Sequence, residues 1–354
     1  MHISDIILSI IVISHNQKKE LQRCVESILA QGIPFAYELI LSDDRSQDGT
    51  FELAQEYQAN YPSLIIATQC NSDDCNPANN SQRSGWNRCN GYKLATGKYI
   101  AHVDADDYFR AGSRVYQHQV ELLEQHPECS LCMQNVWIVQ EGSPLETGRS
   151  WFAQDKLQEG TILTAKEFIS NDYFILNQAF VVRRNPTIDP VALYGKRYVD
   201  SVITYHHLQF GSVICTDSCD YIYMKHSGAV TTSLTENDRT VLWCLGMYIP
   251  LLIPNLTGLF FAANLKHFLK IVQLARRGES LTPASFNSIK ELDAYIYNVF
   301  GKPRLSFYDR VKLNCVRFYL DVLIRFNLHT PFLLRILYCL LVHPKIDNNV
   351  SFKY

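Results

Sequence analysis

Apolar runs alternate with amphipathic helical patterns along the first hundred residues. Short runs rich in β-branched residues have the length of buried strands, and the segments between them repeat apolar side chains at helical spacing. Strands are predicted over residues 8–14, 37–43, 64–69 and 98–104, and helices over residues 18–31, 49–61 and 85–97. This alternation predicts β-α-β units, and therefore an α/β fold with a mostly parallel sheet flanked by helices.

Polar clusters follow three of the predicted strands. The sequence SHN (residues 14–16) follows the first, DD (43–44) ends the second and DADD (104–107) ends the fourth. Because ligands bind beyond the carboxyl ends of parallel strands, we expect these clusters to lie along one rim of the sheet. Three carboxylates within four residues repel one another unless water, cations or protonation relieve the charge. The pattern therefore indicates a site for something positive.

Charge divides the chain into two parts. The length of 354 residues and a hydrophobic content of 47% allow a large core and predict one large domain with an appendage. The net charge of −2 conceals an asymmetry, because residues 1–235 hold 18 Lys and Arg against 27 Asp and Glu, whereas residues 236–354 hold 15 against 8. We therefore predict an acidic domain over 1–235 and a basic, mainly helical region over 236–354.

Cysteine usage and the start of the chain bear on location. The first residues include Asp5 and have no basic segment or small-residue cleavage site, so we expect a cytoplasmic protein with reduced thiols. Two cysteine pairs, Cys129 with Cys132 and Cys215 with Cys219, could bind zinc or be buried in the core. The pairs lie far apart and no His is spaced with them, and the first lies in the strand-like segment 129–139, so buried thiols are favoured.

Three segments, in order, carry a resemblance to a known family. They read SIIVISHNQKKELQRCVESILAQ, ELILSDDRSQDGT and ATGKYIAHVDADDYF. Together they resemble the family 2 glycosyltransferases, which have the GT-A fold, over about two thirds of the chain, residues 8–230. The resemblance implies an inverting, nucleotide-sugar-dependent glycosyltransferase, with a UDP-sugar the expected donor and a glycan or lipid-linked molecule of surface polysaccharide biosynthesis the acceptor. It also implies Mn²⁺ or Mg²⁺ as the cofactor, for which carboxylates are suitable ligands.

The same resemblance implies a set of site residues. Those expected to bind the nucleotide-sugar are Ser14, His15, Asn16, Asp44, Arg83, Arg88, Asp104, Ala105 and Asp106. Those expected to bind the metal are Asp106, Asp107 and His226. Asp44 resembles the family aspartate that accepts a hydrogen bond from the nucleotide base, although it could also cap a turn. His15 stands where the family often has a Tyr that stacks on the base. His226 could instead be structural.

A second acidic segment resembles the part of the family that supplies the catalytic base. The strand-like NQAFVVRRN, residues 177–185, precedes GKRYVDSVITYHHLQFG, whose one carboxylate is Asp200. The resemblance implies that Asp200 deprotonates the acceptor hydroxyl as this attacks the anomeric carbon. Capping of the helix that follows it is the alternative role.

The region 236–354 lies beyond the resemblance, and its function is open between two alternatives. Basic, aromatic-rich helices can lie on an anionic membrane surface, here the inner leaflet. They can also pack as a helical bundle on the main domain or on a second copy of the chain. No nucleic-acid partner is expected. Three rival functions are a sugar nucleotidyltransferase, a haloacid-dehalogenase phosphatase and a non-catalytic sugar-binding relative. The transferase is favoured over the nucleotidyltransferase because SHNQKKE has no glycine for a phosphate loop. It is favoured over the phosphatase because DADD follows the fourth predicted strand and not the first.

Overall fold

The computed structural model describes most of the first two thirds of the chain. The described residues are 6–70, 80–153, 155–171, 173, 176–186 and 199–227. Contacts separate one compact unit made of residues 1–168 and 173–233, which contains the strands discussed below. The predicted helical region 236–354 lies outside the described residues, so it stays a prediction, as does the boundary after residue 235.

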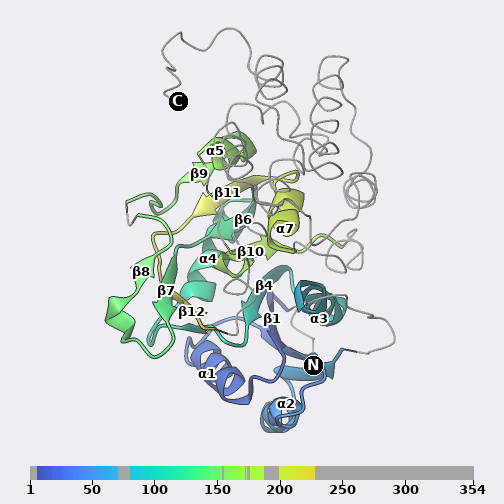
Figure 1. Cartoon of the computed structure of the whole chain (residues 1–354). Coiled ribbons are helices and arrows are strands. Elements are labelled where there is room, and N and C mark those ends of the chain that lie inside the picture. The colour runs from blue at the N-terminus through green and yellow to red at the C-terminus, as the bar shows by residue number, and fades with distance from the viewer. Residues whose placement is uncertain are drawn as a thin grey trace, which may run out of the picture. The chain divides into compact units, whose positions relative to one another are not determined.

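An eight-stranded sheet forms the centre of this unit (Figure 1). Its strands, in spatial order, are β3 (Ile65–Gln69), β2 (Tyr37–Asp43), β1 (Leu8–Ser14), β4 (Tyr99–Asp104), β10 (Phe180–Arg183), β6 (Cys129–Met133), β11 (Ser212–Cys215) and β9 (Ile162–Leu163). The first four are parallel, as predicted, whereas β10 runs antiparallel to both β4 and β6. The predicted α/β class is therefore confirmed, with a mixed sheet.

A second, four-stranded sheet lies beside the first. It consists of β5 (Tyr108–Phe109), β12 (Tyr221–Lys225), β7 (Val136–Gln140) and β8 (Arg149–Ser150). The strand-like segment 129–139 divides between the two sheets, because Gln134 and Asn135 interrupt it. The backbone N–H of Gln134 donates to the oxygen of Ala179, and the Asn135 side chain accepts from the backbone of Val136 and Phe152. These bonds turn the chain from one sheet into the other.

Helices connect the strands of the two sheets. They are α1 (Lys18–Leu29), α2 (Thr50–Asn60), α3 (Asn80–Leu94), α4 (Val115–Gln125), α5 (Ala165–Ser170) and α7 (Val199–His207), with the short 3₁₀ helices η2 (Leu145–Thr147) and η3 (Asn177–Ala179). Figure 1 shows α1 and α3 on opposite sides of β1. The approach of α3 is close, because a Cβ on Gly91 would lie 2.5 Å from Cγ2 of Ile11. Glycine is therefore needed at this contact.

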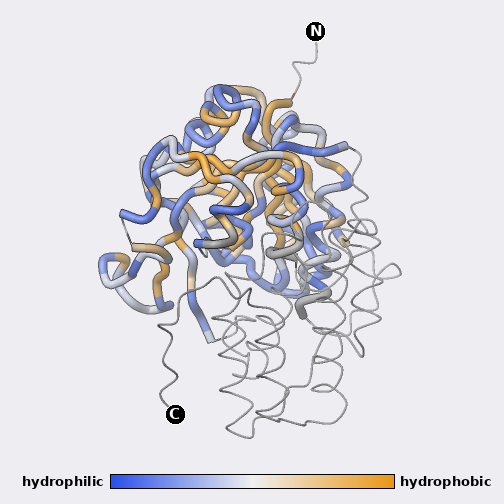
Figure 2. Tube along the Cα trace, turned by 90° about the horizontal axis from the view of Figure 1, so that it is seen from above, coloured by the Kyte–Doolittle hydropathy of each residue, from blue (hydrophilic) through white to orange (hydrophobic). Residues whose placement is uncertain are grey.

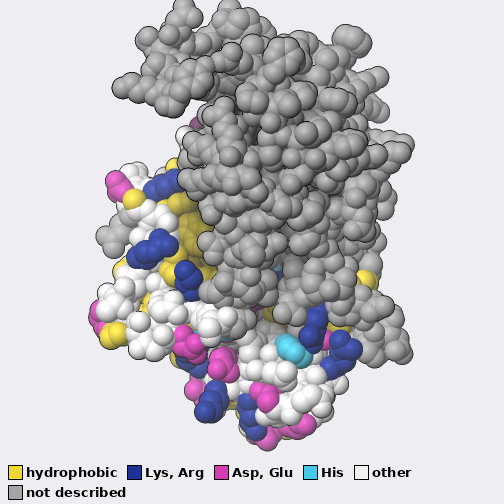
Figure 3. Space-filling view, viewed as in Figure 1, with side chains coloured by type: hydrophobic (Ala, Val, Ile, Leu, Met, Phe, Trp, Pro, Cys, Tyr) yellow, Lys and Arg dark blue, Asp and Glu magenta, His cyan; other side chains and the backbone are white. Residues whose placement is uncertain are grey.

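The core and the surface follow the expected division of hydropathy. Every residue of β1 is buried, and Figure 2 shows the hydrophobic segments concentrated at the centre of the described fold. Figure 3 shows acidic and basic side chains mixed over the described part of one face. None of the helices that the structure describes has the length and hydropathy needed to cross a bilayer.

The strand register brings the predicted polar clusters to one rim. Ser14 pairs with Asp43 across β1 and β2, and Ile13 pairs with Asp104 across β1 and β4. Beyond the strands, the Asp44 N–H donates to the Ser14 oxygen at 2.9 Å, and the Ala105 N–H donates to the Ile13 oxygen at 3.0 Å. The expectation of a shared polar rim is therefore confirmed.

Candidate functional site

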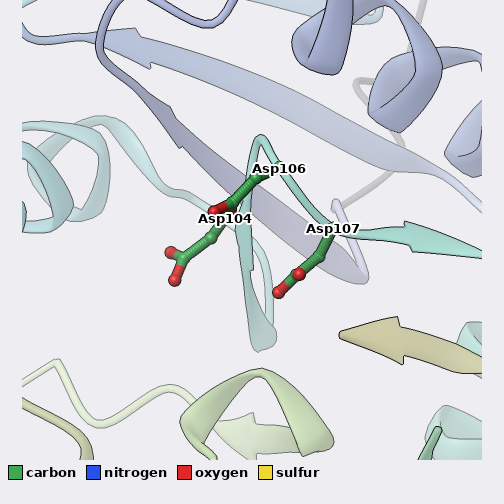
Figure 4. Close-up of side chains that lie close together, drawn as sticks. All are labelled: Asp104, Asp106 and Asp107. Carbon is green, nitrogen blue, oxygen red and sulfur yellow. The ribbon is translucent and has the colours of Figure 1, made fainter. Parts of the chain in front are cut away.

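Three carboxylates meet in the turn between β4 and β5. Asp104, Asp106 and Asp107 each offer an oxygen, and these oxygens lie within 4.8 Å of one another (Figure 4). Burial and the neighbouring Asp104 carboxylate raise the pKa of Asp106, although His226 acts in the opposite direction. Burial, together with the charges of Asp106 and Asp104, raises the pKa of Asp107 well above its ordinary range. The fully ionised cluster is therefore costly unless a positive charge compensates it.

Asp104 is held by two polar side chains from distant segments. Arg88, on α3, donates from Nη2 to Oδ1 of Asp104 at 2.5 Å, and its side chain is only 5% exposed. Gln178, on η3, donates from Nε2 to Oδ2 of Asp104 at 2.5 Å. A buried guanidinium compensates part of the carboxylate charge and fixes its orientation. Asp104 is thus pre-oriented at the end of β4.

Asp106 lies beside His226 and is partly open to solvent. Nε2 of His226, just after β12, is 2.8 Å from Oδ2 of Asp106, and the two side chains are 23% and 19% exposed. On the other side of the turn, Arg23 of α1 donates to the backbone oxygen of Asp106 at 2.6 Å and lies 4.3 Å above the Tyr108 ring. The structure therefore fixes the backbone of Asp106 while leaving its carboxylate and His226 accessible.

Asp107 is fully buried, and both its oxygens accept hydrogen bonds. The hydroxyl of Tyr221 donates to Oδ2 at 2.6 Å, and the backbone N–H of Met224 donates to Oδ1 at 2.8 Å. Both donors belong to β12, whose end leads directly to His226. Asp107 thereby ties the DADD turn to the strand that positions His226.

This group of donors fits a hard divalent cation. Carboxylate oxygens are the ligands that Mg²⁺ and Mn²⁺ prefer, and an added imidazole also suits Mn²⁺. Asp106 and His226 contact each other and are 19% and 23% exposed. Asp104 is 29% exposed and Asp107 is fully buried, and both accept hydrogen bonds from other side chains. A carboxylate oxygen has two lone pairs, so these two side chains keep capacity for a further ligand.

A second charged cluster surrounds Asp44, just after β2. Oδ1 of Asp44 accepts from Nη2 of Arg45 at 3.1 Å, and Oδ2 accepts from Nε of Arg83 at 2.7 Å. Nδ1 of His15 lies 2.7 Å from the backbone oxygen of Asp44. Nη2 of Arg83 is 3.1 Å from both ring nitrogens of His15, a position that requires it to lie over the face of the ring. The cluster combines an acceptor carboxylate with a stacked cation and ring.

Two further predicted residues, Ser14 at the end of β1 and Asn16 just beyond it, fix the backbone around this cluster. Ser14 is buried and donates to Oδ1 of Asp43 at 3.3 Å. Asn16 has a positive φ of 53°, its N–H donates to Oγ of Ser46 at 2.7 Å, and its Oδ1 accepts from the N–H of Gln47 at 2.8 Å. Asn tolerates the left-handed conformation better than most residues. These bonds hold His15 at the rim.

The structure gathers most of the predicted residues at the rim, and it pairs both predicted arginines with carboxylates there. Arg83 and Arg88 pair with Asp44 and Asp104 in this structure, and contact with a diphosphate stays a prediction for both. Asp200 lies in the first turn of α7, and its side chain is outside the described residues, so its catalytic role also stays a prediction. Ala105 is buried and contributes its backbone N–H alone to the rim.

Sequence reasoning missed Tyr221, Gln178 and Arg23. Tyr221 and Gln178 reach the DADD turn from 114 and 74 residues further along the chain. The polar pair that begins NQAFVVRRN was a usable signal for Gln178, because β10 starts at the rim where β4 ends. No local pattern marked Tyr221 or Arg23.

Comparison with known proteins places this fold in a family. Residues 9–185, half of the chain, match the model described as "Glycosyl transferase family 2". "Uncharacterized protein Rv1520" of Mycobacterium tuberculosis is 24% identical over 303 residues, covering 83% of this chain and 75% of the relative. Chondroitin synthase of Escherichia coli is 29% identical over 163 residues, covering 44% of this chain and 21% of the relative.

Among solved structures, S. aureus TarS 1-349 in complex with UDP-GlcNAc is 17% identical. The match has a TM-score of 0.49 and covers 77% of this chain and 71% of that one. The family model includes β1, β2, β4 and the DADD turn, and therefore most of the rim described above. The chain belongs to glycosyl transferase family 2.

Proposed function

We propose that this chain is a metal-dependent, inverting glycosyltransferase that moves a hexosyl or N-acetylhexosaminyl group from a UDP-sugar to a glycan or lipid-linked acceptor in surface polysaccharide synthesis. The observation that carries the proposal is the DADD cluster, which shares one rim of the sheet with the Asp44 cluster in a family 2 chain. The name of its relative, chondroitin synthase, supports a glycan acceptor.

The DADD cluster is the proposed metal site. Asp106, Asp107 and His226 would hold Mn²⁺ or Mg²⁺, with Asp104 adjacent. The ion, when bound, supplies positive charge that stabilises a diphosphate leaving group. The protein's own contribution is positional: Arg88 orients Asp104, and β12 anchors Asp107 and leads to His226.

The Asp44 cluster is the proposed base site. A carboxylate only accepts hydrogen bonds, so Asp44 suits the N3–H of uracil, and the His15 ring offers a face for stacking. Guanine also carries an N–H donor, so GDP is the informative competitor. Asp200 is the proposed catalytic base, which takes the proton of the acceptor hydroxyl during transfer.

The charge difference between the two parts of the chain is the basis for a proposed location of the enzyme. The basic region 236–354 would hold the enzyme at the cytoplasmic face of the membrane, where lipid-linked acceptors are reached, or would contact a second copy of the chain. Flotation with anionic vesicles tests the first role. Full-length protein that stays in solution with such vesicles would exclude it.

Donor turnover tests the enzymatic proposal. Full-length protein is incubated with UDP-glucose or UDP-N-acetylglucosamine and Mn²⁺, and UDP release is measured for the parent, Asp200→Asn and Glu56→Gln. Glu56 is an exposed carboxylate on α2 and serves as the matched control. We expect UDP release by the parent and the control and its loss, by roughly a hundredfold or more, in Asp200→Asn. Equal release by all three proteins would contradict the role of Asp200, and release by none would contradict the donor class.

A further inference from the structure

Buried amide side chains gather at the rim on the far side of Asp104 from the base site. Asn177 and Gln178 precede β10, and Gln134 follows β6. β10 runs antiparallel to both β4 and β6, so its start lies beside the ends of those two strands. The three amides and Asp104 therefore share one edge of the sheet, and the Gln134 N–H donates to the backbone oxygen of Ala179 at 3.0 Å.

Asn177 lacks the hydrogen bonds that a buried amide needs. Its residue is 1% exposed, and neither Nδ2 nor Oδ1 has a hydrogen-bond partner within the part of the chain that the structure describes. Oε1 of Gln178 and Nε2 of Gln134 also lack partners there, and these residues are 5% and 0% exposed. Buried polar groups in folded proteins are almost always paired with protein groups or ordered water, so a cluster of unpaired ones indicates a partner from outside the chain.

Two neighbouring elements place this cluster next to the proposed chemistry. Gln178 uses its Nε2 to hold Asp104 at 2.5 Å, so the unpaired Oε1 belongs to a side chain already fixed beside the DADD turn. Helix α7, whose first turn contains Asp200, packs against η3, the segment that carries Asn177 and Gln178. The amides therefore lie between the metal side of the site and the helix of the proposed base.

We propose that Asn177, together with Gln178 and Gln134, forms a subsite that binds a sugar hydroxyl of the reacting substrates, an inference that rests on the glycosyltransferase function proposed above. A side-chain amide offers one acceptor oxygen and a donor NH₂ group, and a hydroxyl both donates and accepts, so a single hydroxyl can pair with both atoms of Asn177. A site built this way discriminates strongly against a sugar that lacks the hydroxyl, because the amide is then left unpaired.

The hydroxyl can belong to the transferred sugar or to the acceptor, and kinetics separates the two. Full-length parent, Asn177→Leu and Asn177→Ser are compared in Mn²⁺ for UDP affinity, for UDP-glucose hydrolysis and for transfer to a panel of methyl glycosides. Gln31→Met is the matched control, since Gln31 is also a buried amide with an unpaired Nε2 but lies at the carboxyl end of α1, away from the rim.

The expected result is an unchanged UDP affinity with a loss of about tenfold to a hundredfold in kcat/KM for Asn177→Leu, as for a lost hydrogen bond to substrate. Loss in both hydrolysis and transfer assigns the hydroxyl to the donor sugar, and loss in transfer alone assigns it to the acceptor. Asn177→Ser, which keeps a donor and an acceptor, should recover part of the rate. Gln31→Met should keep the parental kinetics.

Thermal melting separates a substrate role from a structural one. Replacing an unpaired buried amide by Leu, which is of similar size, should raise the melting temperature while activity falls. Parental kinetics in Asn177→Leu, whether its melting temperature rises or falls, would overturn the subsite. If the parent itself binds neither UDP nor Mn²⁺, the proposed function fails before the subsite is tested.

Discussion

The hydrogen bond from Tyr221 to Asp107 gives the sharpest prediction about how the site is held together. Tyr221→Phe removes one oxygen and keeps the ring, which packs against Phe109 with centroids 5.3 Å apart. The lost bond is 2.6 Å long, its acceptor is a buried carboxylate, and both residues are fully buried. Removal therefore leaves a fully buried carboxylate oxygen without the hydroxyl that donates to it.

The magnitude follows from the burial of the acceptor. Leaving a buried acceptor without its donor costs about 1–3 kcal/mol, so Tyr221→Phe should lower the free energy of unfolding by about 2 kcal/mol. For a domain of this size, that loss corresponds to a fall of roughly 4–8 °C in melting temperature. Urea unfolding followed by intrinsic fluorescence, and thermal scanning, measure the two quantities on the full chain.

Tyr116→Phe is the matched control for this experiment. Tyr116 is buried and packs on the same Phe109 ring at 5.0 Å, but its hydroxyl has no hydrogen-bond partner among the described residues. Its removal should leave stability unchanged or slightly raised. If Tyr221→Phe costs no more than Tyr116→Phe, then Asp107 is not anchored to β12 as described, and the positioning argument for His226 is refuted.

Three further predictions concern charge at the site and beyond it. Arg88→Met should lower the free energy of unfolding by about 2–3 kcal/mol, because it strips Asp104, which is 29% exposed, of its cation; an unchanged urea midpoint would contradict this. Burial lowers the pKa of His207 to about 3. Between pH 6.5 and about pH 3 the unfolded chain therefore binds a proton at this residue that the folded chain does not bind, and the free energy of unfolding falls as the pH is lowered through this window. His207→Gln should remove about 2–3 kcal/mol of that loss at pH 4.5, and parallel pH profiles of the two proteins would argue against it. His226→Ala should weaken Mn²⁺ binding by about tenfold or more in calorimetry, whereas His118→Ala, which removes an exposed imidazole 2.8 Å from Glu159, should leave it unchanged.

Local sequence patterns predicted the first four parallel strands because each contains an apolar run of strand length between polar or turn-forming segments. The strand predicted over residues 8–14 matches β1, and that over 37–43 matches β2. The second sheet escaped prediction because β5 and β8 are two residues long, which is too short for periodicity to mark. The division of segment 129–139 at Gln134 and Asn135 was not predicted, because it depends on hydrogen bonds to residues that are distant in the sequence.

The residues of the candidate site also divide into those that local sequence predicts and those that it does not. The carboxylates of the DADD turn and Asp44 could be predicted because acidic residues that follow apolar strands are visible in the sequence itself. The partners that orient them were not, since Arg88, Gln178 and Tyr221 reach their carboxylates only through the fold. Arg83 and Arg88 pair with Asp44 and Asp104, and no sequence pattern distinguishes a guanidinium that binds phosphate from one that holds a carboxylate.

The central claim is that the DADD turn binds a divalent cation together with a nucleoside diphosphate. Calorimetry with UDP, with and without Mn²⁺, on the full-length parent, Asp106→Asn and Glu56→Gln tests it most directly. We predict that the parent and Glu56→Gln bind UDP in Mn²⁺, and that chelation of the metal or Asp106→Asn weakens binding by about tenfold or more. Equal UDP affinity with and without Mn²⁺, and in Asp106→Asn, would contradict the account.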